Sequence, residues 1–169
     1  MPEEVTASAS AASPSLNRAV FVFSLMGLMV AGYLWQLHSH PMDIPCGGSQ
    51  GCEQVANSPY SRFPIGFGPP VAMYGTLGYL ALTTLAFLRT LPAMASKDRL
   101  LLRMMALCAG LGVVASLYLT AMELFVIHAI CRWCIASQII MLIVAGLVAL
   151  EGKASGKKNK NHLSETTNA

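Results

Sequence analysis

The chain alternates between four long apolar segments and shorter polar ones. The apolar segments cover residues 19–37, residues 70–88, Met104 to Ile127 and Cys131 to Leu150. The first two contain no charged residue, the third contains one acid, Glu123, and the fourth has Arg132 at its edge. A helix needs roughly 20 apolar residues to cross the hydrocarbon core of a bilayer. The pattern therefore predicts an all-α integral membrane protein, a bundle of four transmembrane helices.

Composition favours the membrane over water as the solvent. Of the 169 residues, 54% are hydrophobic and 11% are charged, which is too apolar for a soluble fold of this length. A cleavable signal peptide is the alternative interpretation of residues 19–37. Its apolar stretch is too long for that, and no small-residue cleavage site follows it before the next loop. We therefore expect residues 19–37 to form the first transmembrane helix.

Basic residues predict the orientation in the membrane. Of the eleven Lys and Arg residues, nine precede the first segment, lie between the second and third, or follow the fourth. Only Arg62 and Arg132 lie in the other two connections. Because positive residues are retained on the cytoplasmic side, both termini are expected in the cytoplasm. This topology also accounts for the net charge of +3, so that nucleic acid is not an expected partner.

The segments outside the membrane differ in composition. Residues 1–17 and 152–169 are polar and cannot bury a core, so we expect two disordered cytoplasmic tails around a membrane domain at 18–151. The one long outer loop runs from His38 to Pro69. Within it, the apolar spacing of residues 52–57 predicts a short helix, which Pro59 would end.

Four of the five cysteines fall on the outer side of this topology. Cys46 and Cys52 lie in the outer loop, Cys131 and Cys134 lie at the outer end of the fourth segment, and Cys108 lies alone in the inner half of the third. Disulfides form and persist on that oxidising side. The sequence CRWC is a Cys-x-x-Cys motif at a helix start, where the helix dipole stabilises a thiolate. This pair is predicted to be redox-active.

The loop pair is open to three interpretations. Taken alone, Cys46 and Cys52 are equally consistent with a structural disulfide. With a second pair on the same face, they could instead collect electrons and pass them on by thiol–disulfide exchange, with a lipid-soluble quinone as the acceptor. A zinc site of four cysteines is the third possibility. The glycines around the loop pair favour a mobile loop, so we expect no metal.

These motifs together resemble the vitamin K epoxide reductase family, and in particular its bacterial members that take the place of DsbB. The matching residues are Cys46, Cys52, Val55, Ser58 and Tyr60 within CEQVANSPYS, the stretch MYGTLGY, and CRWC at the start of the last helix. The resemblance covers about residues 20 to 150. DsbB itself has its two cysteine pairs in the reverse order.

The resemblance implies a four-helix bundle around a quinone, either ubiquinone or menaquinone, with the first outer loop as its cap. It implies that Cys46 and Cys52 shuttle electrons, that Cys134 lies against the quinone and that Cys131 is its resolving partner. Ser58 matches a hydroxyl-bearing position of the family. Gln138 stands where some members have a tyrosine that bonds the quinone, and an amide can still donate a hydrogen bond.

The expected function is reoxidation of a DsbA-like extracytoplasmic thiol protein in a bacterial inner membrane. Many bacterial members carry a fused thioredoxin-like domain that this sequence does not contain, so the donor is expected to be a separate protein. Two alternatives stay open. The chain could act as a reductase of a quinone or quinone epoxide, or as a non-enzymatic membrane scaffold with structural disulfides.

Glu123 is the one acid within the apolar segments that invites a functional interpretation. An ionisable residue in a membrane helix is costly and is by default a functional candidate. We count it with Ser58 and Gln138 as a candidate for the quinone site, where it could take up or relay protons. The alternative is that it lies near the interface, paired with Arg132 or with water.

Overall fold

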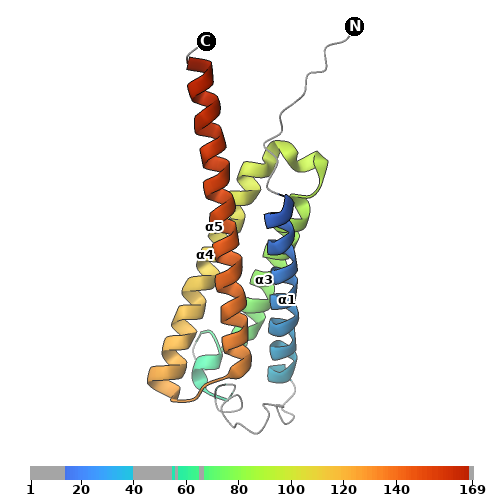
Figure 1. Ribbon diagram of the computed structural model, residues 1–169. Helices are drawn as coiled ribbons and strands as arrows, with labels where there is room; N and C mark the ends of the chain where they lie inside the picture. Colours follow the sequence, from blue (N-terminus) through green and yellow to red (C-terminus); the bar gives the residue numbers. More distant parts are fainter. Residues whose placement is uncertain (1–13, 40–54, 56, 65–66, 168–169) are drawn as a thin grey trace.

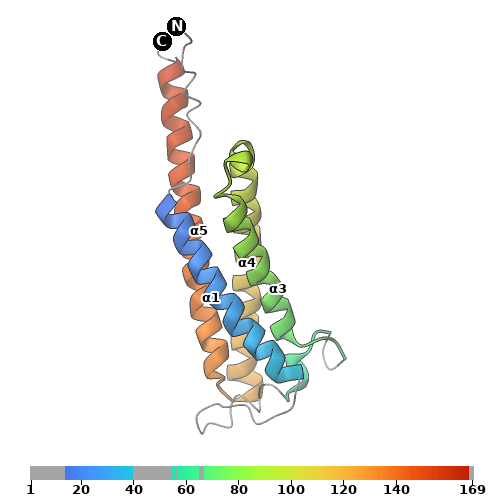
Figure 2. The same cartoon turned by 90° about the vertical axis from the view of Figure 1, so that its right-hand side faces the viewer.

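The computed structural model describes residues 14–39, 55, 57–64 and 67–167, and within this part it is helical with no strand. Four long helices run side by side (Figures 1 and 2). They are α1 (Pro14–Ser39), α3 (Val71–Leu88), α4 (Asp98–Met122) and α5 (Arg132–Thr167). Shorter helical turns are η1 (Pro59–Ser61), η2 (Pro92–Lys97) and the π-helix η3 (Glu123–Ile127). The predicted four-helix bundle is confirmed.

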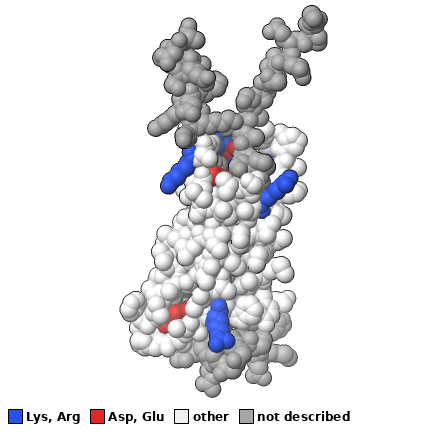
Figure 3. Space-filling view, viewed as in Figure 1, with Lys and Arg blue, Asp and Glu red and all other residues white. Residues whose placement is uncertain are grey.

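Each long helix contains a segment that is long and apolar enough to cross a membrane. Large apolar side chains point outward along these segments, among them Leu111, 72% exposed, and Met29, 70% exposed. Figure 3 shows charged residues at the two ends of the bundle with an uncharged belt between them. Outward apolar side chains cost nothing in lipid, so this multi-pass membrane protein presents its hydrophobic residues to the bilayer.

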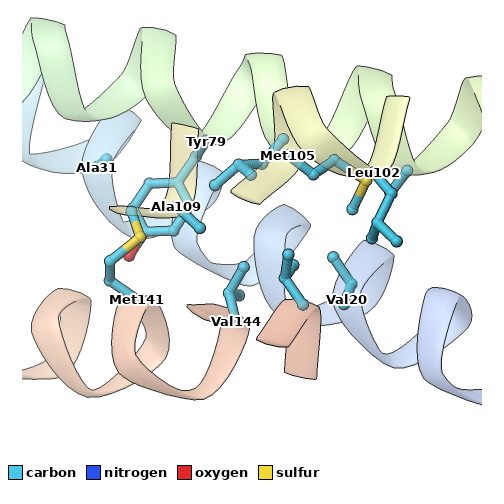
Figure 4. Packing of buried hydrophobic residues seen from close by; sticks show 11 residues of the cluster. Val20, Ala31, Tyr79, Leu102, Met105, Ala109, Met141 and Val144 are labelled. Atoms are coloured by element: carbon cyan, nitrogen blue, oxygen red, sulfur yellow. The ribbon is translucent and has the colours of Figure 1, made fainter. Parts of the chain in front are cut away.

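The core lies where the four helices face one another. Val20 of α1, Tyr79 of α3, Met105 of α4 and Val144 of α5 are fully buried in one cluster (Figure 4). Gly27 permits the close approach of α1 and α3, because a Cβ atom there would overlap the ring of Tyr79. Small residues at helix contacts are typical of membrane bundles, in which close packing rather than the hydrophobic effect holds helices together.

A buried polar cluster joins the helices at the end that is predicted to be cytoplasmic. Arg89, directly after α3, bonds through Nε to Asp98 Oδ1 at 2.8 Å, and through its Nη1 it contacts Glu151 of α5. The same nitrogen donates to Asn17 Oδ1 of α1 at 3.3 Å. Burial opposes the charge, yet the bonds and charges of Asp98 and Glu151 outweigh it and raise the pKa of Arg89. We call these four residues the inner polar cluster.

The helices extend further than their apolar segments. The first begins at Pro14, inside the expected tail, because proline is well suited to the first turn of a helix. The last continues to Thr167, where residues 152–169 were expected to be disordered, and Figure 1 shows it reaching past the other helices. The tail is helical because an existing helix propagates readily along the chain. Each residue added to an existing helix gains a hydrogen bond, and no proline interrupts the sequence.

Little of the outer loop is described. Cys46 and Cys52 lie outside the described residues, as does most of the short helix predicted at 52–57. Pro59 begins η1 rather than following a described helix. Further on, an isolated bridge pairs Arg62 with Pro70, and the hydroxyl of Tyr74 donates to the carbonyl of Phe63 at 3.3 Å. These contacts attach the end of the loop to the start of α3.

Candidate active site, a dithiol beside an apolar cavity

The CRWC motif forms the first turn of α5. The helix begins at Arg132, so Cys131 precedes it and Cys134 is its third residue. The backbone N–H of Cys134 donates to Cys131 Sγ at 3.3 Å. The Cys131 sulfur thus occupies the place of an N-cap oxygen, which accepts from the third residue of the helix. The positive end of the helix dipole favours negative charge on this sulfur, as the motif predicted.

Both cysteines are free thiols, and other side chains cover them. Cys131 is 2% exposed and packs against Val55 of the outer loop and against Trp133. The ring of Trp133 contacts Tyr33 of α1, with the ring centres 5.4 Å apart. Val55 is three residues beyond Cys52 in the chain. A described part of the loop therefore lies directly on the cysteine pair.

Glu123 lies beside the same pair. It begins the π-helix η3, which follows α4, and it is 5% exposed. It borders the same cavity as Cys131 and Cys134, and its carboxyl group lies next to them. Among the described residues no ion pair joins Glu123 to Arg132, although that pairing was one expectation for it. The buried acid faces the thiols instead.

The local backbone explains this position. Five residues of π-helix widen the last turn, and His128 ends it in the left-handed conformation with φ of 52°. The N–H of Ala129 then donates to the carbonyl of Glu123 at 3.2 Å. Such π-turns are rare and occur frequently at functional sites. The apolar pattern had predicted an uninterrupted helix as far as Ile127.

A cavity of about 490 Å³ extends from the cysteines into the bundle between α3, α4 and α5. Its wall includes Glu123, Cys131, Cys134, Gln138, Tyr79 and Met141. Gln138 lies one turn after Cys134 on the same helix face, as its spacing predicts. The volume is within the range of small-molecule sites. The cavity is mostly apolar, with a thiol pair, an amide and a carboxyl group, and these groups fit a quinone ring.

The cavity also reaches the membrane-facing surface. Leu111 of α4 and Tyr74 of α3 contribute to its wall, and they are 72% and 43% exposed. A side chain that borders both the cavity and the exterior marks an edge of the opening. Both residues belong to segments that are apolar enough to cross a membrane, so the opening is placed where an apolar molecule could enter from a bilayer.

Ser58 does not border this cavity. Its hydroxyl donates to the carbonyl of Val55 at 2.9 Å, and the neighbouring Ser61 borders the cavity instead. The hydroxyl of Ser61 in turn donates to the carbonyl of Ser58 at 2.8 Å. Sequence reasoning missed Ser61, and no spacing signal distinguishes it. Tyr79 also borders the cavity, and its hydroxyl donates to the Ser137 carbonyl at 2.7 Å.

Comparison with protein families identifies a relationship. The family model for the Vitamin K epoxide reductase family matches residues 18–149, which is well over half of the chain and includes both cysteine pairs. No curated protein matches the sequence.

Proposed function

Because this membrane protein belongs to the Vitamin K epoxide reductase family, a family of oxidoreductases, we propose that it is a quinone-dependent protein-thiol oxidase. It oxidises an extracytoplasmic dithiol protein of the DsbA type and passes the electrons to a membrane quinone. The relay runs from Cys46 and Cys52 to Cys131 and Cys134, and then to the quinone.

One observation carries this proposal. The thiol pair Cys131 and Cys134 borders an apolar cavity of about 490 Å³ that reaches the membrane-facing surface. A structural disulfide has no need of such a cavity, whereas a lipid-soluble electron acceptor requires one. In the proposed step two thiols become a disulfide, and the quinone takes up two electrons and two protons to become a quinol.

Each proposed residue has a distinct task. Cys134, the third residue of α5, borders the cavity and delivers the electron pair. Cys131 closes the disulfide and is the sulfur that the loop pair attacks. The amide of Gln138 offers a hydrogen bond to a quinone oxygen. Ser58 would act through the loop backbone, since its hydroxyl bonds Val55.

The loop position supports a shuttle. Val55 packs on Cys131 and follows Cys52 by three residues, which span at most about 11 Å of chain, so the covalent connection permits the loop pair to approach Cys131. Thiol–disulfide exchange requires direct approach of one sulfur to another, which a loop on the outer surface permits. A soluble donor meets the loop from the same side.

The proposed location is a bacterial inner membrane with both termini in the cytoplasm. Arg62 and Arg132 belong to the end that carries the cysteines, and Arg18, Arg89 and Lys153 belong to the opposite end. By the retention of positive residues in the cytoplasm, the cysteine end faces outward.

The decisive experiment follows electrons from a reduced DsbA-like protein to ubiquinone or menaquinone, with the purified chain in nanodiscs. We expect donor disulfide and quinol to form in equal amounts. A matched control is Leu107→Ala, which changes an exposed residue outside the cavity wall and should leave the rate unchanged. If quinone stays oxidised while the cysteines resist mild reduction, the protein is a scaffold with structural disulfides.

A further inference from the structure

We propose that Glu123 is a catalytic residue that accepts the proton of the Cys134 thiol during oxidation of the cysteine pair. The inference deepens the proposed function and rests on it. It starts from a juxtaposition: a carboxyl group that is 5% exposed lies next to a thiol pair in the wall of one cavity. Two elements, the end of α4 and the start of α5, must meet to make this juxtaposition.

The backbone that holds Glu123 is unusual in two ways. A π-helix is rare, and a left-handed conformation is uncommon for residues other than glycine. The left-handed residue costs free energy that surrounding contacts must compensate. Glu123 itself keeps the α-helical phase, because its N–H bonds the carbonyl of Leu119. The π-turn and His128 redirect the chain after Glu123, and this path leads into the cysteine motif that borders the same cavity.

Electrostatic stabilisation of a thiolate does not explain why Glu123 lies beside the cysteines. A carboxylate beside a thiol disfavours the thiolate, because two negative charges repel each other. The thiolate is nevertheless the form that reacts. A carboxylate that takes the thiol proton avoids this conflict, since it becomes neutral at the moment when the sulfur becomes negative.

The step balances as follows. The Cys134 proton moves to a Glu123 oxygen, the electron pair of the sulfur passes to the quinone, and Cys131 sulfur bonds to Cys134 sulfur. Glu123 returns its proton to a quinone oxygen. The Cys131 proton leaves to water at the outer face, and the quinone takes its second proton from that water. The sum is two thiols and a quinone giving a disulfide and a quinol.

Glu123 is the one carboxyl group among the described residues of the cavity wall, where the other titratable groups are Cys131, Cys134, Cys108, Tyr74 and Tyr79. At the same end of the bundle Arg62 and His128 are exposed, and among the described residues no ion pair joins either to Glu123. The helix α3 contains no charged residue. The charged residues of α1 and α4 stand at the opposite end of the bundle, and Arg132 is exposed without an ion pair to Glu123.

The test measures, without quinone, how fast iodoacetamide alkylates Cys134 in the Cys131→Ala protein, with mass spectrometry of the Cys134 peptide. The rate is followed from about pH 5 to about pH 9, across the ordinary range of carboxyl and thiol groups. Proton transfer to Glu123 gives a branch of the rate that does not depend on pH at the acidic end. We expect Glu123→Gln to lose this branch.

The pH–rate profiles expected for Glu123→Gln and for the parent protein cross. Below neutral pH, Glu123→Gln reacts about tenfold more slowly or worse, and its rate rises tenfold per pH unit because hydroxide must remove the proton. Above about pH 8 it reacts faster than the parent, because the repelling charge is gone. Glu123→Asp should keep the pH-independent branch, because it retains a carboxyl group. This variant is the control for the effect of a substitution as such. Glu151→Gln, a buried acid at the other end, leaves the profile unchanged.

The proposal is overturned if the alkylation rate of Glu123→Gln equals that of the parent at every pH. It is also overturned if that rate is lower, or higher, than the parent's over the whole pH range. The same variants are then given quinone, and Glu123→Gln should reduce it about 100-fold more slowly than the parent. Failure of the proposed function would look different. In that case Cys134→Ala would still reduce quinone, whatever the alkylation profile of Glu123→Gln.

Discussion

At the scale of single residues, Cys134 is the cysteine that we propose to react with the quinone. It borders the cavity, and its backbone N–H is bonded to the sulfur of Cys131. Replacing Cys134 by Ala should reduce quinone reduction to the background rate, measured as quinol absorbance with dithiothreitol as the reductant. Retention of the native rate in Cys134→Ala would mean that the relay ends elsewhere.

Cys131 gives a complementary prediction. Without Cys131 the disulfide cannot close, so that a Cys134 thiolate stays beside the bound quinone. Adding quinone to Cys131→Ala should therefore produce a new visible absorbance band. The matched control is Cys131→Ala/Cys134→Ala, which should show no band. A band of equal size in both proteins would remove Cys134 from the quinone site.

The sequence placed three candidate residues on one helix face, and all three border the same cavity. Cys131, Cys134 and Gln138 share a face because they are three and four residues apart. Prediction from the sequence did less well where two elements must meet. The π-turn at Glu123, the left-handed His128 and the exchange of Ser58 for Ser61 at the cavity depend on how separate segments pack. No periodicity in the chain encodes those contacts.

At the scale of elements, the outer loop is predicted to carry the shuttle pair Cys46 and Cys52, which passes electrons from the donor protein to the CRWC pair. Cys46→Ala and Cys52→Ala should each abolish oxidation of the donor protein, because the shuttle disulfide cannot form. Both variants should still pass electrons from dithiothreitol to quinone, because a small reductant reaches Cys131 and Cys134 directly. Two parallel assays of quinol formation measure this. If the double variant keeps both activities, the loop pair is structural.

The inner polar cluster is predicted to hold the helices together. Arg89 is fully buried, and its removal would leave Asp98 and Glu151 without a positive partner. Breaking one partner of a buried ion pair typically costs about 3 to 5 kcal/mol. We expect Arg89→Ala to lower the thermal unfolding midpoint in detergent markedly. Arg99→Ala, which changes an exposed arginine outside the cluster, serves as the control. Equal midpoints would show that the cluster adds nothing to stability.

At the scale of the whole molecule, the four spans were predictable because crossing a bilayer depends on composition over about 20 residues rather than on detailed packing. The inner polar cluster was not predictable in the same way. Its members are residues 17, 89, 98 and 151, and nothing in the linear pattern pairs them. Hydropathy also underestimated α5, because it reports where the membrane ends and not where the helix ends.

Topology is the prediction that belongs to this scale. Reporter fusions after Lys97 and after Leu150 should report the cytoplasm, and a fusion near Gln50 should report the outside, in keeping with the distribution of basic residues. Paired alkaline phosphatase and fluorescent protein fusions provide the measurement. The reverse pattern would place both cysteine pairs in a reducing compartment and would contradict the thiol oxidase.

The inner polar cluster has a further consequence for biosynthesis. As the chain leaves the ribosome, Arg89 emerges after Asn17, and Asp98 follows nine residues later as the first carboxylate partner of Arg89. Glu151 is made last and lies on the only helix that carries the CRWC motif. Until that helix is inserted, the guanidinium has one carboxylate instead of two, and the dithiol does not yet exist. Arrival of α5 therefore completes the inner ion pairs and the outer cysteine pair in a single event, so that a half-made chain has no redox chemistry at CRWC to perform.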